Sequence, residues 1–381
     1  MNIFEKQEKK VEYIELIYDL IFVYIVGRNN SLLHNFENGF VAPLSLLAYI
    51  LCTLAIIQIW NFSTFYINMF GRNGAREHIF IFVNMYLLYF MGQGTRTDWV
   101  AFQAQYHIAW ALILLNIALQ YFIELSNHKA DVWNRDLIKR MISTLCIEAA
   151  IILVAAFVNP KLSFILSAVA IVCGIALTGF NRNKSPGGKT DFAHLAERAM
   201  LYVVFTFGEM IIAVSSYFVG DGGFDISVIY FSLMAFMIVV GLFLTYGFFY
   251  NRLLDTEGDF DGMLYMAIHI FLIFVLNNIT AALEFMREEH VDLIPKMIFM
   301  IASSVAFFVL LFPLSFYSKC GCRPTKKQIV AFIGITAAFT LLMLLLKENM
   351  YLNILITDLF IFSMFFAMYL PYRKMKTEHL T

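Results

Sequence analysis

The sequence predicts an all-α polytopic membrane protein with about twelve transmembrane helices. Of its 381 residues, 60% are hydrophobic and only 14% are charged, whereas soluble domains carry about 45–50% apolar and about 25% charged residues. The mean hydropathy is +0.73. The apolar residues also gather into runs of about 20, the length that a helix needs to cross the hydrocarbon core of a bilayer.

Twelve such runs follow one another with brief connections, so no soluble domain fits between them. The first run carries the acidic residues Glu15 and Asp19 in its apolar part, the seventh carries an arginine, and the third is the shortest. In chain order the predicted spans are residues 12–28, 42–68, 78–93, 103–125, 138–158, 161–180, 195–218, 225–250, 262–284, 294–317, 327–346 and 350–371.

The longest connection, residues 181–191, contains the turn-forming run Ser185-Pro186-Gly187-Gly188 and is typical of a flexible hinge. It is predicted to be a cytoplasmic linker between two six-helix halves, residues 1–180 and 192–381. A repeat supports these halves, because the six residues from His78 to Val83 are similar to the seven from His269 to Val275 in the ninth span. Six spans per half would give a parallel repeat, related by an axis along the membrane normal.

The positive charges predict the orientation. With the N-terminus in the cytoplasm, 20 of the 27 Lys and Arg residues fall in segments on that side and six fall on the other, while Arg198 lies within a span. Because cytoplasmic loops carry the excess of Lys and Arg, both termini are expected in the cytoplasm.

Several functional classes are excluded by composition and motifs. The net charge is −1, with no basic stripe that would bind nucleic acid. Phosphate-binding glycine loops, nucleophile elbows and ATP-binding modules are absent from the sequence. The five cysteines are scattered, and the pair Cys320 and Cys322 is too few for a structural zinc site. We therefore predict no cofactor and no metal.

The first span carries Glu15 and Asp19, which are four residues apart and so share one helix face. Counting from the start of the helix at 1.5 Å per residue, Asp19 would lie roughly 10 Å into the bilayer. A central charge costs about 2.5–3.5 kcal/mol on insertion scales. We expect the two acids to share a proton or to meet a cation, although Glu15 could also reach the lipid headgroups.

The seventh span carries the charged group His194, Glu197 and Arg198, followed by Glu209. A guanidinium inside a bilayer needs a carboxylate partner, and the best match in depth is Asp19. We therefore predict an ion pair between Arg198 and Asp19. The pair could be purely structural or part of a proton or substrate relay, and the sequence leaves both alternatives open.

Other polar side chains in the spans are secondary candidates for a polar pathway. A lone buried histidine is more often a hydrogen-bonded packing residue than a ligand, and none of the histidines has the spacing of a metal site on one helix. His269 is kept with the main candidates, and the secondary candidates are His78, Glu148, Asn277, Asn278 and Asp358.

Two segments resemble the signatures of the bacterial low temperature requirement A (LtrA) family. Glu15 to Val23 is similar to its N-terminal signature, Glu-Leu-aromatic-aromatic-Asp-Leu-Val-Phe-Val, with Ile17 at an aromatic position. His194 to Arg198 followed by Phe207-Gly208-Glu209 resembles its second signature, His-x-x-Glu-Arg then Leu-Gly-Glu. The resemblance implies a multi-pass protein of the bacterial cytoplasmic (inner) membrane. It implies no molecular activity, substrate or catalytic residue.

Our first functional hypothesis is a secondary, proton-coupled transporter or ion-conducting carrier of an unknown substrate. The pathway would use Glu15, Asp19, Glu197, Arg198 and Glu209, with His194 and His269. The alternatives are a membrane-embedded enzyme acting on a lipid and a non-transporting structural or sensory protein. We favour a non-enzymatic role and assign no catalytic residue. The predicted partners are the lipid bilayer and an unknown small molecule or ion, for which protons are the candidate, and the sequence leaves the oligomeric state open.

Overall fold

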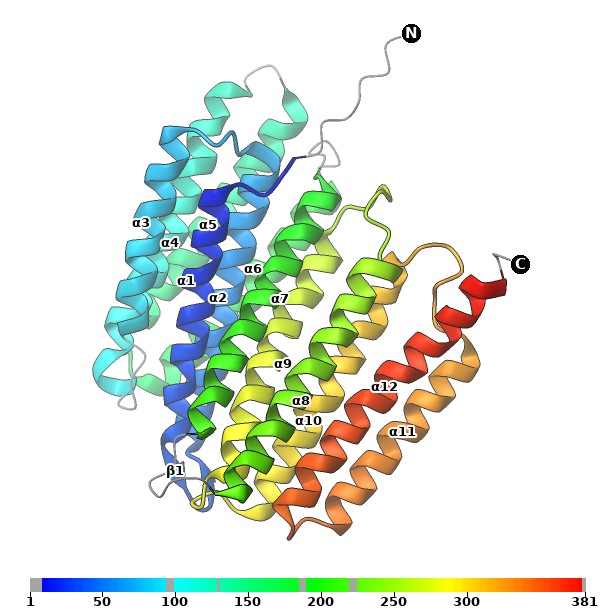
Figure 1. Cartoon of the computed structure of the whole chain (residues 1–381). Helices are drawn as coiled ribbons and strands as arrows, with labels where there is room; N and C mark the ends of the chain where they lie inside the picture. Colours follow the sequence, from blue (N-terminus) through cyan, green and yellow to red (C-terminus); the bar gives the residue numbers. More distant parts are fainter. Residues whose placement is uncertain (1–8, 94–98, 129–130, 185–189, 219–224, 379–381) are drawn as a thin grey trace. The chain divides into compact units, whose positions relative to one another are not determined.

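The computed structural model describes residues 9–93, 99–128, 131–184, 190–218 and 225–378 (Figure 1). Within these ranges the chain is built almost entirely of α-helices, as predicted. They are α1 (Tyr13–Asn29), α2 (Pro43–Phe70), α3 (Ala75–Gln93), α4 (Trp99–Asn127), α5 (Val132–Ala155), α6 (Pro160–Lys184), α7 (Phe192–Ser215), α8 (Ile226–Phe248), α9 (Met263–Arg287), α10 (Leu293–Leu314), α11 (Lys326–Leu345) and α12 (Met350–Glu378).

Nine of the helices in the described ranges are long and apolar enough to cross a membrane. The prediction of an all-helical, multi-pass membrane protein is confirmed at this level. The three remaining helices are α1, α3 and α5, of 17, 19 and 24 residues, and their crossing of the membrane stays a prediction. The central part of the predicted linker, residues 185–189, lies outside the described residues.

The short connecting elements are local and follow the turn residues. A 3-10 turn η1 (Asn30–His34) leads into a hairpin of β1 (Phe36–Glu37) and β2 (Phe40–Val41). Asn38 and Gly39 form its two-residue turn, with φ of 52° and 76°, because this turn type needs positive φ at both positions. The other short elements are η2 (Ser216–Phe218), the π-helical turn η3 (Phe249–Leu253) and η4 (Ser315–Tyr317).

The chain divides into two compact units. The first comprises Met1–Glu37, Val41–Tyr202 and Asp259–Ile270, and the second comprises Asn38–Phe40, Val203–Gly258 and Phe271–Thr381. Helices α7 and α9 therefore each begin in the first unit and end in the second. The predicted division into six-helix halves related by a repeat stays a prediction.

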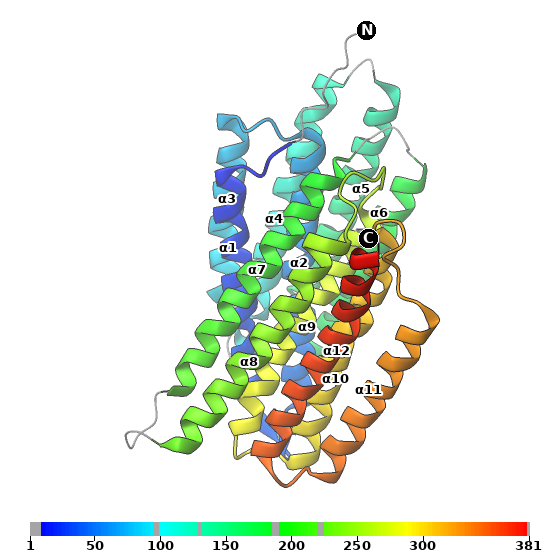
Figure 2. The same cartoon turned by 45° about the vertical axis from the view of Figure 1, so that its right-hand side comes forward.

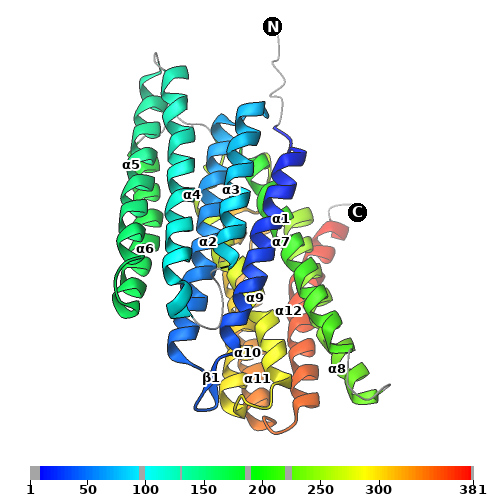
Figure 3. The same cartoon turned by 90° about the vertical axis from the view of Figure 1, so that its left-hand side faces the viewer.

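In the first unit, α2 is the innermost helix. It packs against α1, α4 and α6, while α4 packs along α3 and α5, and α5 along α6 (Figure 3). Aromatic side chains fill the interior because they bury a large apolar area. Tyr66 of α2 meets Tyr121 of α4 edge to face, with ring centroids 5.0 Å apart.

In the second unit, α8 packs along α12, and α12 along α11 (Figure 2). Gly241 allows α8 to approach α12 closely, since a Cβ at this position would come within 2.6 Å of Ile361 Cγ2. Only a small share of α11 is buried inside the protein. A uniformly apolar helix with so little protein contact is typical of a surface that faces lipid.

Candidate functional site

Glu15 and Asp19 are both buried inside the first unit, on one face of α1. Glu15 is 2% exposed and Asp19 is fully buried. Glu15 also closes the first turn of α1, because the Glu12 amide donates to its Oε1 atom at 3.3 Å. Neither acid extends to the surface, so the interpretation of Glu15 as a headgroup-reaching residue is not what the structure shows.

Arg198 of α7 joins both acids, and the predicted ion pair with Asp19 is present. Its Nε atom donates to Asp19 Oδ2 at 3.1 Å, and its Nη2 atom donates to Asp19 Oδ1 at 2.5 Å. The Nη1 atom donates to Glu15 Oε2. Arg198 is itself fully buried, so one guanidinium connects α1 with the first part of α7, which lie side by side (Figure 1). The planar fork of arginine suits this bidentate geometry.

A hydrogen-bond network fixes the orientation of His194, one turn before Arg198. The Asp191 amide donates to Asn68 Oδ1 at 3.0 Å, so the other end of the Asn68 side chain is its NH₂ group. That group donates to the Asp191 carbonyl at 2.9 Å and to His194 Nδ1 at 3.0 Å. The proton of a neutral His194 therefore sits on Nε2, which lies 3.4 Å from Glu15 Oε2.

Trp60 of α2 supplies the third hydrogen bond to Asp19. Its Nε1 atom donates to Asp19 Oδ1 at 2.8 Å. The Trp60 ring packs edge to face on Tyr202 of α7, with centroids 4.6 Å apart. Asp19 is thus held by hydrogen bonds from two helices, and its charge is compensated inside the protein, as a buried carboxylate requires.

Lys9 brings a second cation close to the cluster. Its Nζ atom donates to the carbonyl oxygens of Ile67 and, at 3.0 Å, Gly71, and so caps the C-terminal end of α2. Burial lowers the pKa of Lys9, and the neighbouring carboxylates, first Glu15 and then Glu77, oppose that effect. With Lys9 and Arg198 against Glu15 and Asp19, the cluster carries equal numbers of positive and negative charges.

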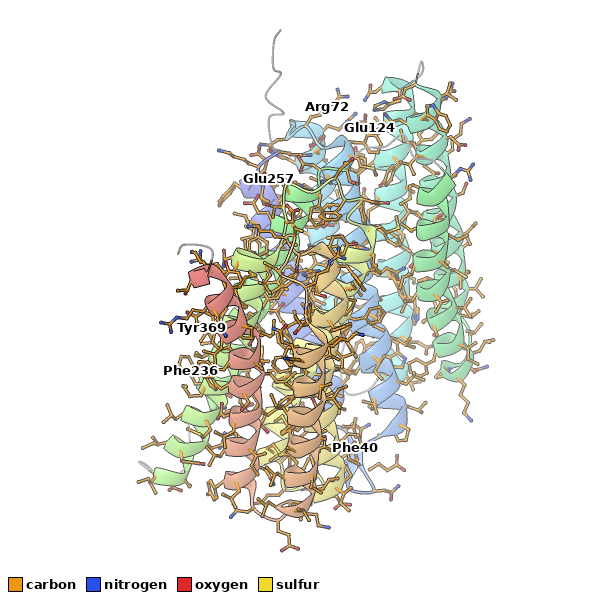
Figure 4. All side chains as sticks on the ribbon, turned by 90° about the vertical axis from the view of Figure 1, so that its right-hand side faces the viewer. Phe40, Arg72, Glu124, Phe236, Glu257 and Tyr369 are labelled. Atoms are coloured by element: carbon orange, nitrogen blue, oxygen red, sulfur yellow. The ribbon has the colours of Figure 1, made fainter. Side chains whose placement is uncertain are left out.

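A polar hollow of about 580 Å³ reaches the cluster from the end of the first unit where α1 and α3 begin. Glu15 is one of the residues that line it. The charged residues that line it are Lys9, Lys10, Glu12, Glu15, Arg72 and Glu77, and Figure 4 labels Arg72 at this end of the helices. A polar hollow that shares Glu15 with a buried ion-pair cluster is an arrangement suited to exchanging protons or a small polar solute.

The structure does not bring every candidate residue into this cluster. Glu197 lies half-buried on α7, and His78 makes a 2.7 Å hydrogen bond to Asn73 near the surface. His269 is fully buried in α9, where its Nδ1 atom donates to the Tyr265 carbonyl at 2.8 Å. Glu209 is half-buried and belongs to the second unit.

The secondary candidates are also dispersed. Glu148 of α5 is 1% exposed, and neither of its carboxyl oxygens has a hydrogen-bond partner among the described residues. The same holds for Asp358 of α12 in the second unit, which is 5% exposed. Asn277 is buried and Asn278 is half-buried in α9. Among the described residues no group of three or more His, Cys, Asp or Glu side chains is placed to hold a metal ion.

A comparison with protein-family models decides the family. The model described as bacterial low temperature requirement A protein (LtrA) matches residues 10–363. The chain belongs to the LtrA family. No curated protein and no solved structure gave a match. The two LtrA-like signatures seen in the sequence supply Glu15, Asp19, His194 and Arg198, which the structure joins in one buried cluster.

Four residues of this LtrA-family site were missed as site residues by the sequence reasoning. Lys9 lies outside every predicted span, Asp191 falls in the predicted linker, and Trp60 and Asn68 lie in or at the end of the second predicted span without being named as candidates. One sequence feature points to two of them, since a polar or indole side chain in an apolar span needs a hydrogen-bond partner. The identity of that partner depends on which helices pack together.

Proposed function

We propose that this LtrA-family membrane protein is a proton-coupled carrier of a small molecule or ion. The observation that carries the proposal is the polar hollow of about 580 Å³ that Glu15 lines. Glu15 shares Arg198 with the deeper acid, Asp19. A proton that enters the hollow therefore needs one transfer to reach a group in contact with the centre of the cluster.

The chemistry depends on Arg198 having two carboxylate partners. A guanidinium does not lose its proton in proteins, whereas a carboxylate does gain one. Protonation of Glu15 or Asp19 would neutralise one of the two carboxylates paired with Arg198. The ion pairs that connect α1 with α7 would then be weaker. An equilibrium between two conformations shifts when protons bind one of them better. His194 Nε2 lies 3.4 Å from Glu15 Oε2, so a proton that Glu15 receives from the hollow can be passed on to a buried imidazole.

The hollow has both signs of charge at its wall, with Lys9, Lys10 and Arg72 opposed by Glu12, Glu15 and Glu77. This balance favours a small zwitterion or a proton over a highly charged solute. We further propose that both termini lie in the cytoplasm and that the protein resides in the bacterial inner membrane. The hollow then opens to the cytoplasm, because it adjoins the beginning of α1.

Proton flux into proteoliposomes tests the proposal. Vesicles with an internal pH dye and an imposed potassium diffusion potential would be compared with and without an ultrafiltered, protein-free cell extract inside. We expect the protein to conduct protons above the level of empty vesicles in at least one condition. Asp19→Asn should reduce the flux to that level, because the deeper acid is the group that must bind and release the proton.

Glu257→Gln is the matched control, since it also neutralises one acid but at an exposed site in the loop after η3 (Figure 4). It should conduct protons like the unmodified protein. Size-exclusion chromatography and thermal unfolding in detergent would establish that Asp19→Asn is folded. Flux no greater than in empty vesicles in both conditions, or full flux in folded Asp19→Asn, would overturn the proposal.

A second candidate role is structural, and the complete pairing of Arg198 favours it. Each of its three guanidinium nitrogens donates a hydrogen bond to a carboxylate of the protein, either Asp19 or Glu15. In that case the cluster only fastens α1 to α7. The two roles separate in one experiment, because a purely structural pair predicts a loss of stability in Asp19→Asn and no proton flux in the unmodified protein.

A further inference from the structure

A groove with one basic end follows the seam between α8 and α12 in the second unit. It consists of two adjoining hollows of about 530 and 250 Å³. Phe248, Arg252 and Tyr369 line both hollows, so they are continuous. Figure 4 shows Tyr369 on the C-terminal half of α12, and its ring centroid lies 5.6 Å from that of Phe248.

The basic end is formed by Arg252, Arg373 and Lys376, which are exposed. No acidic side chain lines either hollow among the described residues. None of the three cations forms an ion pair within the part of the chain that the structure describes. Their charges are therefore open to a ligand, and the end of the groove attracts anions.

The other end of the groove is apolar. Phe243, Leu244 and Phe365 line it, together with the half-buried Gly247. A Cβ on Gly247 would meet nothing closer than 3.9 Å, so the missing side chain leaves the groove open at this point. From Arg252 to Phe243 the helix rises about 13 Å at 1.5 Å per residue, which is close to half of the roughly 30 Å hydrocarbon thickness.

We propose that this groove binds an anionic phospholipid of the surrounding membrane. Its phosphate lies among Arg252, Arg373 and Lys376, and one acyl chain lies along Phe243, Leu244 and Gly247. Basic pockets between transmembrane helices are suited to anionic headgroups, and tyrosines such as Tyr369 and Tyr372 favour the interface between headgroups and acyl chains. Cations at one end and an apolar trough of one leaflet's depth together match a lipid better than a soluble anion or an uncharged tail.

Native mass spectrometry of the purified, delipidated protein with added phosphatidylglycerol or phosphatidylcholine tests the proposal. We expect phosphatidylglycerol to bind the unmodified protein preferentially. The triple variant R252Q/R373Q/K376Q should bind it about a hundredfold more weakly, with about fivefold for each charge. Gly247→Leu keeps all three charges but fills the trough, and it should also weaken phosphatidylglycerol binding.

The matched control is K319Q/K326Q/K327Q, which removes three exposed basic residues elsewhere in the second unit. It should bind phosphatidylglycerol like the unmodified protein. Equal losses in both triple variants would show unspecific attraction to the protein's basic loops and overturn the proposal. So would equal binding of the two lipids, competition by soluble glycerol phosphate, unchanged binding in Gly247→Leu, or a dimer that forms through this face in place of the lipid.

Discussion

Asp19 and Glu148 are both buried in the first unit, but among the described residues only Asp19 meets a counter-charge. Asp19 accepts hydrogen bonds from Arg198 and Trp60. The carboxyl group of Glu148 has no hydrogen-bond partner among the described residues. A Cβ on Gly174 would overlap both Glu148 Oε2 and Gln58 Nε2, so three helices meet around this group, and no described residue forms an ion pair with it. The depth of burial is therefore the same, while the electrostatic environment is opposite.

The difference teaches how the interior accommodates an acid. An ionised carboxylate that leaves water needs a paired charge and hydrogen bonds, and without them the neutral form is favoured. Asp19 has the environment of an ionised group that fastens helices together. Glu148 has the environment of a neutral group. Replacing its carboxyl group by an amide should therefore change the free energy of unfolding very little. Three predictions test this comparison, beginning with the largest expected effect.

Removal of the counter-charge should have the largest effect. In Arg198→Leu, Glu15 and Asp19 would stay buried without the guanidinium that holds both. Breaking a buried pair in this way costs about 3–5 kcal/mol, and we expect that loss in the free energy of unfolding, measured by circular dichroism in a denaturant series in detergent micelles.

Arg198→Lys is the companion variant for this test. It keeps the positive charge but loses the bidentate geometry. Its free energy of unfolding should therefore lie between those of Arg198→Leu and the unmodified protein. A folded Arg198→Leu with a loss below about 1 kcal/mol would mean that Asp19 is not an ionised partner, and the contrast with Glu148 would disappear.

The two amide replacements, Asp19→Asn and Glu148→Gln, should differ by about 1.5–3 kcal/mol in the free energy of unfolding. Asp19→Asn weakens hydrogen bonds that involve charged groups, which contribute about 1.5–3 kcal/mol each. Glu148→Gln removes no hydrogen bond or ion pair among the described residues and should stay within about 1 kcal/mol of the unmodified protein. The same denaturant series measures both variants, and equal losses would contradict the comparison.

Much of the fold could be predicted from the sequence, because a bilayer imposes both the length and the composition of a spanning helix. The predicted span at 225–250 corresponds to α8 at Ile226–Phe248, and the π-helical turn that follows it was not foreseen. The pairing of Arg198 with Asp19 was also predictable, since a guanidinium in an apolar span has few possible partners.

The remaining contacts could not be read from the sequence because they depend on tertiary packing. Lys9 caps α2 although 58 residues separate it from Ile67, and no pattern along the chain links the two. The neighbourhood of Glu148 depends in the same way on Gly174, which lies on a different helix. Charge counting finds buried acids, but only the packing of helices decides which of them is paired.

Two amides on α2 extend the comparison to the neighbours of each acid, with the smallest expected effect. Asn68 makes hydrogen bonds to the Asp191 amide, the Asp191 carbonyl and His194. Gln58, next to Glu148, makes one at 3.2 Å to the Ile171 carbonyl, and its Oε1 atom has no partner among the described residues.

At about 1 kcal/mol for each hydrogen bond, Asn68→Leu should destabilise the protein by about 1–2 kcal/mol more than Gln58→Leu. Both substitutions place the same side chain in the same helix, so helix propensity and added apolar volume largely cancel between them. The midpoint of denaturant unfolding measures the difference. If Gln58→Leu proves the more damaging of the two, Glu148 depends on a bond to Gln58, and its carboxyl group is held as firmly as that of Asp19.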